Sequence, residues 1–150
     1  MRESKEIYYL RIASMVSTRS TCLRRNYGAV IVKNDRIVST GYNGAPRGCT
    51  NCNDSNFCIR KANNVAHNSD YTDCVAVHAE QNAIIHADYN DMQDATLYLA
   101  GYDADDGFPV KDIDCCPLCK RMIINAGISK VIFQENDGTY RVEEVASWRR

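Results

Sequence analysis

Two helix-like segments alternate with two apolar segments in the second half of the chain, and this alternation most constrains the fold. HAEQNAIIHADY and CPLCKRMIINAG have helical patterns, and Gly127 ends the second. ATLYLA and KVIF are short and apolar, as expected of buried strands. Strands that are joined through a helix usually pair in parallel by a right-handed crossover. The second half therefore predicts an α/β fold with parallel pairing.

The first half predicts a helix, a hairpin and an irregular segment. Apolar residues recur every three to four positions across residues 5–18, which indicates a helix. YGAVIV, the turn KNDR and IVSTGYNG then predict a hairpin between Gly28 and Gly41. Residues 45–77 are polar and too long for an ordinary loop, so we expect an irregular insertion there. The chain has 150 residues, which suits a single domain spanning 1–150.

Composition argues against several classes of protein. The chain has 18 Lys plus Arg, 19 Asp plus Glu and a net charge of −1, so it lacks the basic surface of a nucleic-acid binder and favours small substrates. Its N-terminal sequence carries charges at short intervals, so we expect no secretory signal, no membrane span and a cytoplasmic location. Eight cysteines in that compartment are expected to be reduced, and to serve metals or catalysis more often than disulfides.

Cys116 and Cys119 are three residues apart at the start of a predicted helix, where Pro117 loses no hydrogen bond. The unpaired N–H groups and the positive end of the helix dipole lower thiol pKa values there and favour the thiolates that zinc needs. His78 opens the other predicted helix and is expected to face the same point. Three protein ligands leave one tetrahedral position for water, the arrangement of a catalytic zinc.

Glu80 follows His78 by two residues, so its carboxylate could shuttle protons beside the metal. H-x-E followed by P-C-x-x-C is the signature of zinc-dependent nucleobase deaminases. Cys115 stands where the signature has proline, although its main chain could still meet the substrate amino group. A register that used Cys115 would give a spacing of four to Cys119 and lose the one-turn geometry. A C-x-x-C pair alone could be a redox pair or packed thiols, and only its combination with HAE favours a metal.

Three long segments resemble the deoxycytidylate (dCMP) deaminases, especially their bacterial and phage branch: STCLRRNYGAVIVKNDRIVSTGYNGAP, HAEQNAII and CPLCKRMIINAGISKVIF. The resemblance implies a three-layer α/β/α cytidine-deaminase fold, with helices on both faces of a five-stranded mixed sheet. It implies hydrolysis of dCMP to dUMP and ammonia, which supplies dUMP for dTMP synthesis. It also implies a homo-oligomer, usually a hexamer, that dCTP activates and dTTP inhibits, with Mg2+ on the triphosphate.

The same resemblance assigns residues to the nucleotides. It implies that Asn43 hydrogen-bonds the deoxyribose and that the backbone of Ala79 meets the pyrimidine carbonyl. It also associates the turn within GYNG with the effector nucleotide, through Tyr42, Asn43 and Gly44. A tight turn that merely ends a strand is the alternative interpretation of these residues.

Arg24 and Arg25 precede the first predicted strand and are candidates to bind a 5'-phosphate. Adjacent side chains in a strand point to opposite faces, so we expect at most one of the two to serve a given phosphate. A solvated pair of arginines is the alternative.

A second, structural zinc is implied by the resemblance, with ligands Cys22, Cys52, His67 and Cys74. The fourth ligand is open, because another branch of the family uses an acidic residue where this chain has Ala76. A closed four-ligand zinc would explain how the insertion stays ordered, and buried free thiols are the alternative.

Two rival functions remain. A tRNA-editing or free-base deaminase is one, but tRNA binding would need a basic surface, and neither enzyme is expected to carry GYNG together with STC. A non-catalytic, zinc-stabilised nucleotide-binding module is the other, and it predicts a closed metal site in which Glu80 is dispensable.

Overall fold

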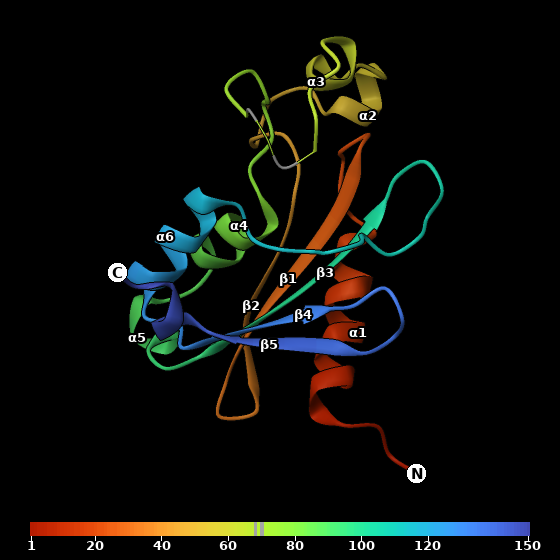
Figure 1. Ribbon diagram of the computed structural model, residues 1–150. Helices are drawn as coiled ribbons and strands as arrows, with labels where there is room; N and C mark the ends of the chain where they lie inside the picture. Colours follow the sequence, from red (N-terminus) through yellow and green to blue (C-terminus); the bar gives the residue numbers. More distant parts are fainter. Residues whose placement is uncertain (68, 70) are drawn as a thin grey trace.

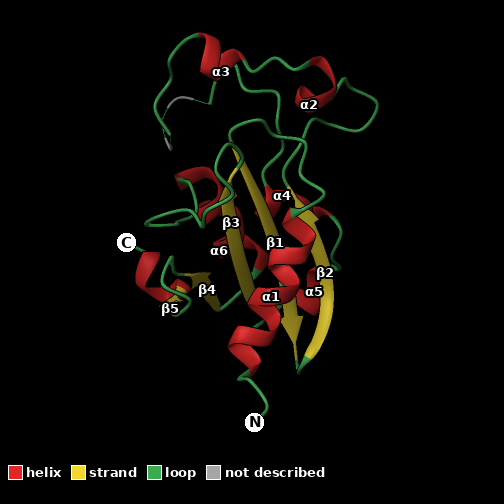
Figure 2. Ribbon diagram, turned by 90° about the vertical axis from the view of Figure 1, so that its right-hand side faces the viewer, coloured by secondary structure: helices red, strands yellow, loops and turns green. Residues whose placement is uncertain are grey.

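The computed structural model describes residues 1–67, 69 and 71–150, and it contains a five-stranded sheet with helices on both faces (Figures 1 and 2). The strand order is β2-β1-β3-β4-β5. The strands are β1 (Arg25–Lys33), β2 (Arg36–Tyr42), β3 (Thr96–Asp103), β4 (Lys130–Gln134) and β5 (Tyr140–Glu144). This architecture confirms the predicted three-layer α/β/α fold with a mixed sheet.

One pair of neighbouring strands is parallel and the other three pairs are antiparallel. β3 and β4 run in parallel, as predicted for strands connected through a helix. β1 pairs antiparallel with β2 and with β3, and β5 pairs antiparallel with β4. The predicted β1–β2 hairpin turns at Asn34 and Asp35, which both have positive φ, at 52° and 60°. Asn and Asp tolerate this conformation, so the sequence suits a tight hairpin turn.

Alternate residues of the central strands face two separate apolar layers. Val30 and Val32 pack with α1 (Lys5–Ser17), the helix predicted at residues 5–18. Ala29 and Ile31 belong to the opposite layer, which also contains buried residues of α4 (Ala79–Ile85) and α6 (Pro117–Ala126). Because side chains alternate along a strand, both faces of β1 are buried. The helices that carry HAE and C-x-x-C therefore share one face of the sheet.

Local sequence sets the ends of these helices. Cys116 is the N-cap of α6 with Pro117 in its first turn, and Gly127 ends the helix at a φ of 87°, as predicted. The helical pattern predicted from His78 to Tyr89 is divided into two helices. α4 ends at Ile85, and a new helix, α5 (Tyr89–Met92), begins where the Asp88 side chain accepts a hydrogen bond from Asn90 N.

Between β2 and α4, the insertion (residues 45–77) contains two short helices, α2 (Cys52–Ser55) and α3 (Ile59–Ala62). Both helices lie beyond one end of the sheet (Figure 1). A backbone bridge between Gly44 and Val77 closes the base of the insertion, with N–O distances of 3.1 and 2.7 Å. At the other end of the chain, β5 is followed by a 3-10 turn, η1 (Val145–Trp148). No helix in the described residues is both long and apolar enough to span a bilayer.

Candidate active site

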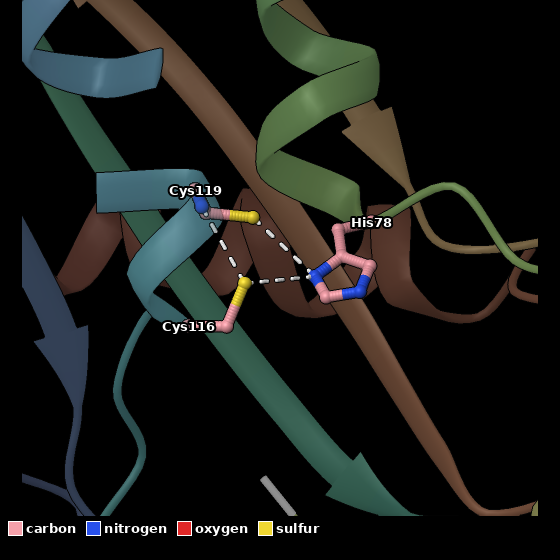
Figure 3. A group of neighbouring side chains, drawn as sticks. All are labelled: His78, Cys116 and Cys119. Carbon is pink, nitrogen blue, oxygen red and sulfur yellow. Dashed lines mark hydrogen bonds between the residues drawn. The ribbon is translucent and has the colours of Figure 1, made fainter. Parts of the chain in front are cut away.

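The first turns of α4 and α6 bring His78, Cys116 and Cys119 together (Figure 3). His78 Nδ1 lies 3.5 Å from Cys116 Sγ and 3.3 Å from Cys119 Sγ. All three ligand atoms lie within 4.8 Å of one another, and within the described residues this is the single group of metal-ligand type that does so. One nitrogen and two sulfurs at these separations fit a tetrahedral zinc with one position left open.

Hydrogen bonds at the start of α6 favour a thiolate on Cys116. Its Sγ accepts a hydrogen bond from Cys119 N at 3.4 Å. The hydrogen bond from the Cys119 side chain lowers the pKa of Cys116, and His78 lowers it further, against the effect of burial. Cys115 is also buried but lies outside the three-residue group. The arrangement therefore favours Cys116 with Cys119 over the register that uses Cys115.

Glu80 lies in the first turn of α4 and is only 4% exposed. Burial raises the pKa of its carboxyl, while the nearby His78 and a hydrogen bond from the Cys115 thiol oppose this rise. Glu80, His78 and Cys116 line the same cavity. A carboxyl group in this place can hold a proton next to the three candidate metal ligands.

The same cavity contains both predicted phosphate-binding arginines. Arg24 Nη1 and Arg25 Nε are buried and have no hydrogen-bond partner. The sequence predicts that at most one of these side chains serves a given phosphate. That expectation was based on strand alternation, but Arg24 precedes β1 and is free of the alternation. The cavity lining comprises Cys22, Arg24, Arg25, Tyr27, Asn43, Arg60, His67, Tyr71, Cys74, Ala76, His78, Ala79, Glu80, Asp114 and Cys116.

Asn43 lines this cavity and is bonded to the backbone of β1. Its Oδ1 accepts from Tyr27 N, and its Nδ2 donates to Arg25 O, both at 2.9 Å. An amide has four hydrogen-bonding positions, so two remain for a ligand. Tyr42 and Gly44, the other residues predicted to contact an effector, are not part of the cavity lining. The backbone N of Ala79 belongs to the first turn of α4, where N–H groups have no partner within the helix.

The four residues predicted for a second zinc are not gathered at bonding distance. Cys22, His67 and Cys74 line the cavity, whereas Cys52 does not. Burial raises the pKa of Cys52, and the nearby thiols Cys22, Cys58 and Cys74 raise it further. Burial lowers the pKa of His67, and Arg25 and Arg24 lower it further. Thus His67 lies near the arginines, and Cys58, which was not predicted, lies near Cys52.

Further residues that line the cavity and were not predicted from sequence include Tyr27, Arg60, Tyr71 and Asp114. Tyr27 could have been found, because it opens the predicted strand YGAVIV two residues after Arg25. Arg60 and Tyr71 lie in the insertion, where the sequence has no period that would indicate which side chains point inward.

A mixed sheet with one histidine and two cysteines at two converging helix starts, beside a buried glutamate, defines the class of zinc-dependent deaminases. A family model described as the cytidine and deoxycytidylate deaminase zinc-binding region matches residues 3–135. The chain belongs to this family.

Individual relatives point to one branch of the family. The deoxycytidylate deaminase of Mycobacterium phage D29 is 38% identical over 131 residues, which cover 84% of this chain and 91% of the phage protein. That of Saccharomyces cerevisiae is 35% identical over 147 residues, and the match covers 96% of this chain but only 41% of the yeast protein. The apo crystal structure of dCMP deaminase from cyanophage S-TIM5 has a TM-score of 0.61 at 28% identity, covering 92% of this chain and 89% of the phage chain. A second structure of that enzyme contains dCMP and dUMP.

Proposed function

We propose that the protein hydrolyses dCMP to dUMP and ammonia. One observation carries the proposal: one cavity is lined by the candidate metal ligands His78 and Cys116, with Cys119 beside them, by the buried Glu80, and by two arginines that each have a buried, unpartnered nitrogen. A pyrimidine deaminase needs the first two features, and a 5'-phosphate needs the third. The similarity to phage and yeast deoxycytidylate deaminases supports the same substrate.

His78, Cys116 and Cys119 would hold the zinc, which supplies a Lewis acid that makes water nucleophilic near neutral pH. Glu80 takes a proton from the water that adds at C4 of the cytosine. It delivers protons to N3 and to the departing amino group, so that one water enters and one ammonia leaves. In this proposal the N–H of Ala79 donates to the pyrimidine carbonyl, and the main chain of Cys115 contacts the amino group.

Arg24 and Arg25 would bind the 5'-phosphate. Buried donors without partners are costly, and a phosphate oxygen satisfies them with charge-assisted hydrogen bonds. Asn43 retains free hydrogen-bonding positions for the deoxyribose, while its other bonds hold the backbone at Arg25. The cavity therefore suits a nucleoside monophosphate better than a nucleoside.

The loss of cytosine absorbance tests this function directly. We expect dCMP to be deaminated far faster than deoxycytidine. Glu80→Gln should lower kcat by about 10²–10⁴-fold without loss of zinc, while Glu144→Gln at an exposed position should not lower it. Arg24→Gln or Arg25→Gln should raise KM for dCMP, and Arg36→Gln on the exposed surface should not. Absence of turnover in the zinc-loaded wild type would favour the non-catalytic module.

Further features of the proposal come from the family resemblance. We propose a cytoplasmic homo-oligomer, a hexamer, and sedimentation tests this state. We also propose that dCTP activates the enzyme and dTTP inhibits it, with Mg2+ bound to the triphosphate. Tyr42, Asn43 and Gly44 are the proposed effector residues. A second zinc would be bound by Cys22, Cys52, His67 and Cys74, and elemental analysis tests it. Two zinc ions per chain would support this site, whereas one per chain would contradict it.

A further inference from the structure

A chain of side-chain contacts leads from the insertion to the candidate metal ligand His78. The Arg60 guanidinium carbon lies 4.3 Å from the centre of the Tyr71 ring. The edge of that ring meets the imidazole of His78, with centroids 4.8 Å apart and planes at 67°. All three residues line the active-site cavity. The insertion thus places an aromatic side chain directly beside the metal-binding group.

Arg60 ties the segment that carries Tyr71 to α3. It is only 7% exposed, although it is charged. Its Nη2 donates to the backbone carbonyls of Ala66 at 2.9 Å and Ser69 at 3.3 Å. A guanidinium has a rigid planar set of donors, and a cation over an aromatic face is attractive. Arg60 therefore fixes both the backbone that leads to Tyr71 and the Tyr71 ring.

The ring of Tyr71 is more available to a ligand than that of the other tyrosine in the cavity lining. Among the residues that line the cavity, Tyr27 is the other tyrosine. Its ring packs so closely on β3 that a Cβ at Gly101 would lie 2.5 Å from it. Tyr71 is only half-buried, lies between His78 and Arg60, and lines the same cavity as Arg24, Arg25 and Glu80.

We propose that Tyr71 contacts the pyrimidine nucleotide beside His78 and that Arg60 is the residue that positions Tyr71. The proposal rests on the deaminase function and adds a substrate contact from the insertion. An aromatic ring contributes to base binding by stacking, typically about 1–3 kcal/mol per base, or roughly 5–150-fold in affinity. The contact acts on binding, because Tyr71 carries no group that the proton transfers require.

The first test removes the aromatic ring. Tyr71→Leu should raise the Kd of the product dUMP, measured by calorimetry, and the KM of dCMP by about tenfold or more, with kcat changed less. Tyr71→Phe keeps the ring and should stay within about threefold of wild type. Tyr89→Leu, at an exposed tyrosine on α5, is the matched control and should change neither constant. Unchanged dUMP binding in Tyr71→Leu would overturn the proposal.

The second test asks whether Arg60 acts through Tyr71. Arg60→Met should weaken dUMP binding in the same direction, and Arg60→Lys, which keeps a cation near the ring, should restore part of it. The double variant Arg60→Met/Tyr71→Leu should bind no worse than Tyr71→Leu alone, because both changes remove one contact. Additive losses would overturn the role of Arg60.

Zinc content and melting temperature, measured on every variant, separate a substrate contact from support of His78. Weaker binding with full zinc content supports the proposal, whereas loss of zinc in Tyr71→Leu contradicts it. If the wild type deaminates dCMP normally and Tyr71→Leu changes neither the Kd of dUMP nor the KM of dCMP, the Tyr71 proposal is rejected while the deaminase function stands. A zinc-loaded wild type that neither binds dUMP nor deaminates dCMP would reject the deaminase function as well.

Discussion

The two sides of the active-site cavity are built in different ways. On one side, α4 and α6 pack their buried residues onto the sheet, and the candidate zinc ligands lie at the starts of these helices. On the other side, Arg60 is the single buried residue among the described residues of 45–77, and it carries a charge. One side is held by an apolar core and the other by hydrogen bonds and a cation.

This difference separates two requirements of an enzyme of this class. Metal ligands must keep fixed distances, and a close-packed core provides that rigidity. A nucleotide must also enter and leave, which is easier where the wall of the cavity has little apolar burial and can open locally. The comparison predicts that changes in the two regions will have effects of different size.

Hydrogen exchange should give the largest contrast between the two regions. We expect the amides of β1 and β3 to exchange only by global unfolding, and those of 51–66 by local opening. The difference in protection should be about a thousandfold or more. Mass spectrometry with peptide resolution measures it. Equal protection of the strands and of residues 51–66 would contradict the comparison. An increase in the protection of residues 51–66 when zinc is added would show that a metal closes the insertion.

Adding one methyl group at a glycine should give the next contrast. A Cβ at Gly41 would lie 2.3 Å from Ala83 N and 2.5 Å from Ala79 O, so α4 must move off the sheet. Gly41→Ala should lower the free energy of unfolding by about 3 kcal/mol and impair turnover. Gly48 lies in the insertion with a φ of +81° and open space around it, so Gly48→Ala should cost only about 1 kcal/mol. Urea denaturation of both variants decides between these values, and equal costs would contradict the comparison.

Lowering the pH should change the free energy of unfolding by a smaller amount, through Glu143 on the edge strand β5. Burial raises the pKa of Glu143, but hydrogen bonds from Trp148 and Arg141 outweigh it and leave the pKa lowered. A lowered carboxyl pKa stabilises the fold above the unfolded value of about 4.3, and the gain disappears as the pH falls through the folded value.

Glu143→Gln should therefore lower the free energy of unfolding by about 1 kcal/mol or less at pH 7, and the difference should vanish at low pH. The chain has a single tryptophan, so the fluorescence of Trp148 follows this region. Glu144→Gln, one residue away and exposed, is the control. A difference that persists in acid would exclude this carboxylate as the cause.

The sheet side could be predicted from sequence because burial repeats along it. The apolar period of residues 5–18 gave α1 to within a residue at its end, and the run KVIF marked β4. The starts of α4 and α6 were also predictable, because HAE and C-x-x-C combine ligand chemistry with helix-start chemistry. These patterns are local, so they do not depend on knowledge of the tertiary structure.

The insertion could not be predicted in the same way. Arg60 is buried by its contacts with two carbonyls and Tyr71, partners that no sequence period reveals. That both Arg24 and Arg25 line the cavity depends on where β1 begins, and strand boundaries are the least certain part of a sequence pattern. The resemblance implied five strands, but the sequence pattern did not locate β5, because only one of its faces is partly buried.

The N-terminus lies at the end of the molecule opposite α2 and α3, below α1 (Figure 1). α1 itself packs on the face of the sheet that carries none of the candidate zinc ligands. A tether joined to the N-terminus would therefore hold the protein on a sensor surface by the end opposite α2 and α3, with the insertion, which supplies part of the cavity lining, directed towards the solution. Immobilised measurements of nucleotide binding are thus compatible with the geometry of this fold.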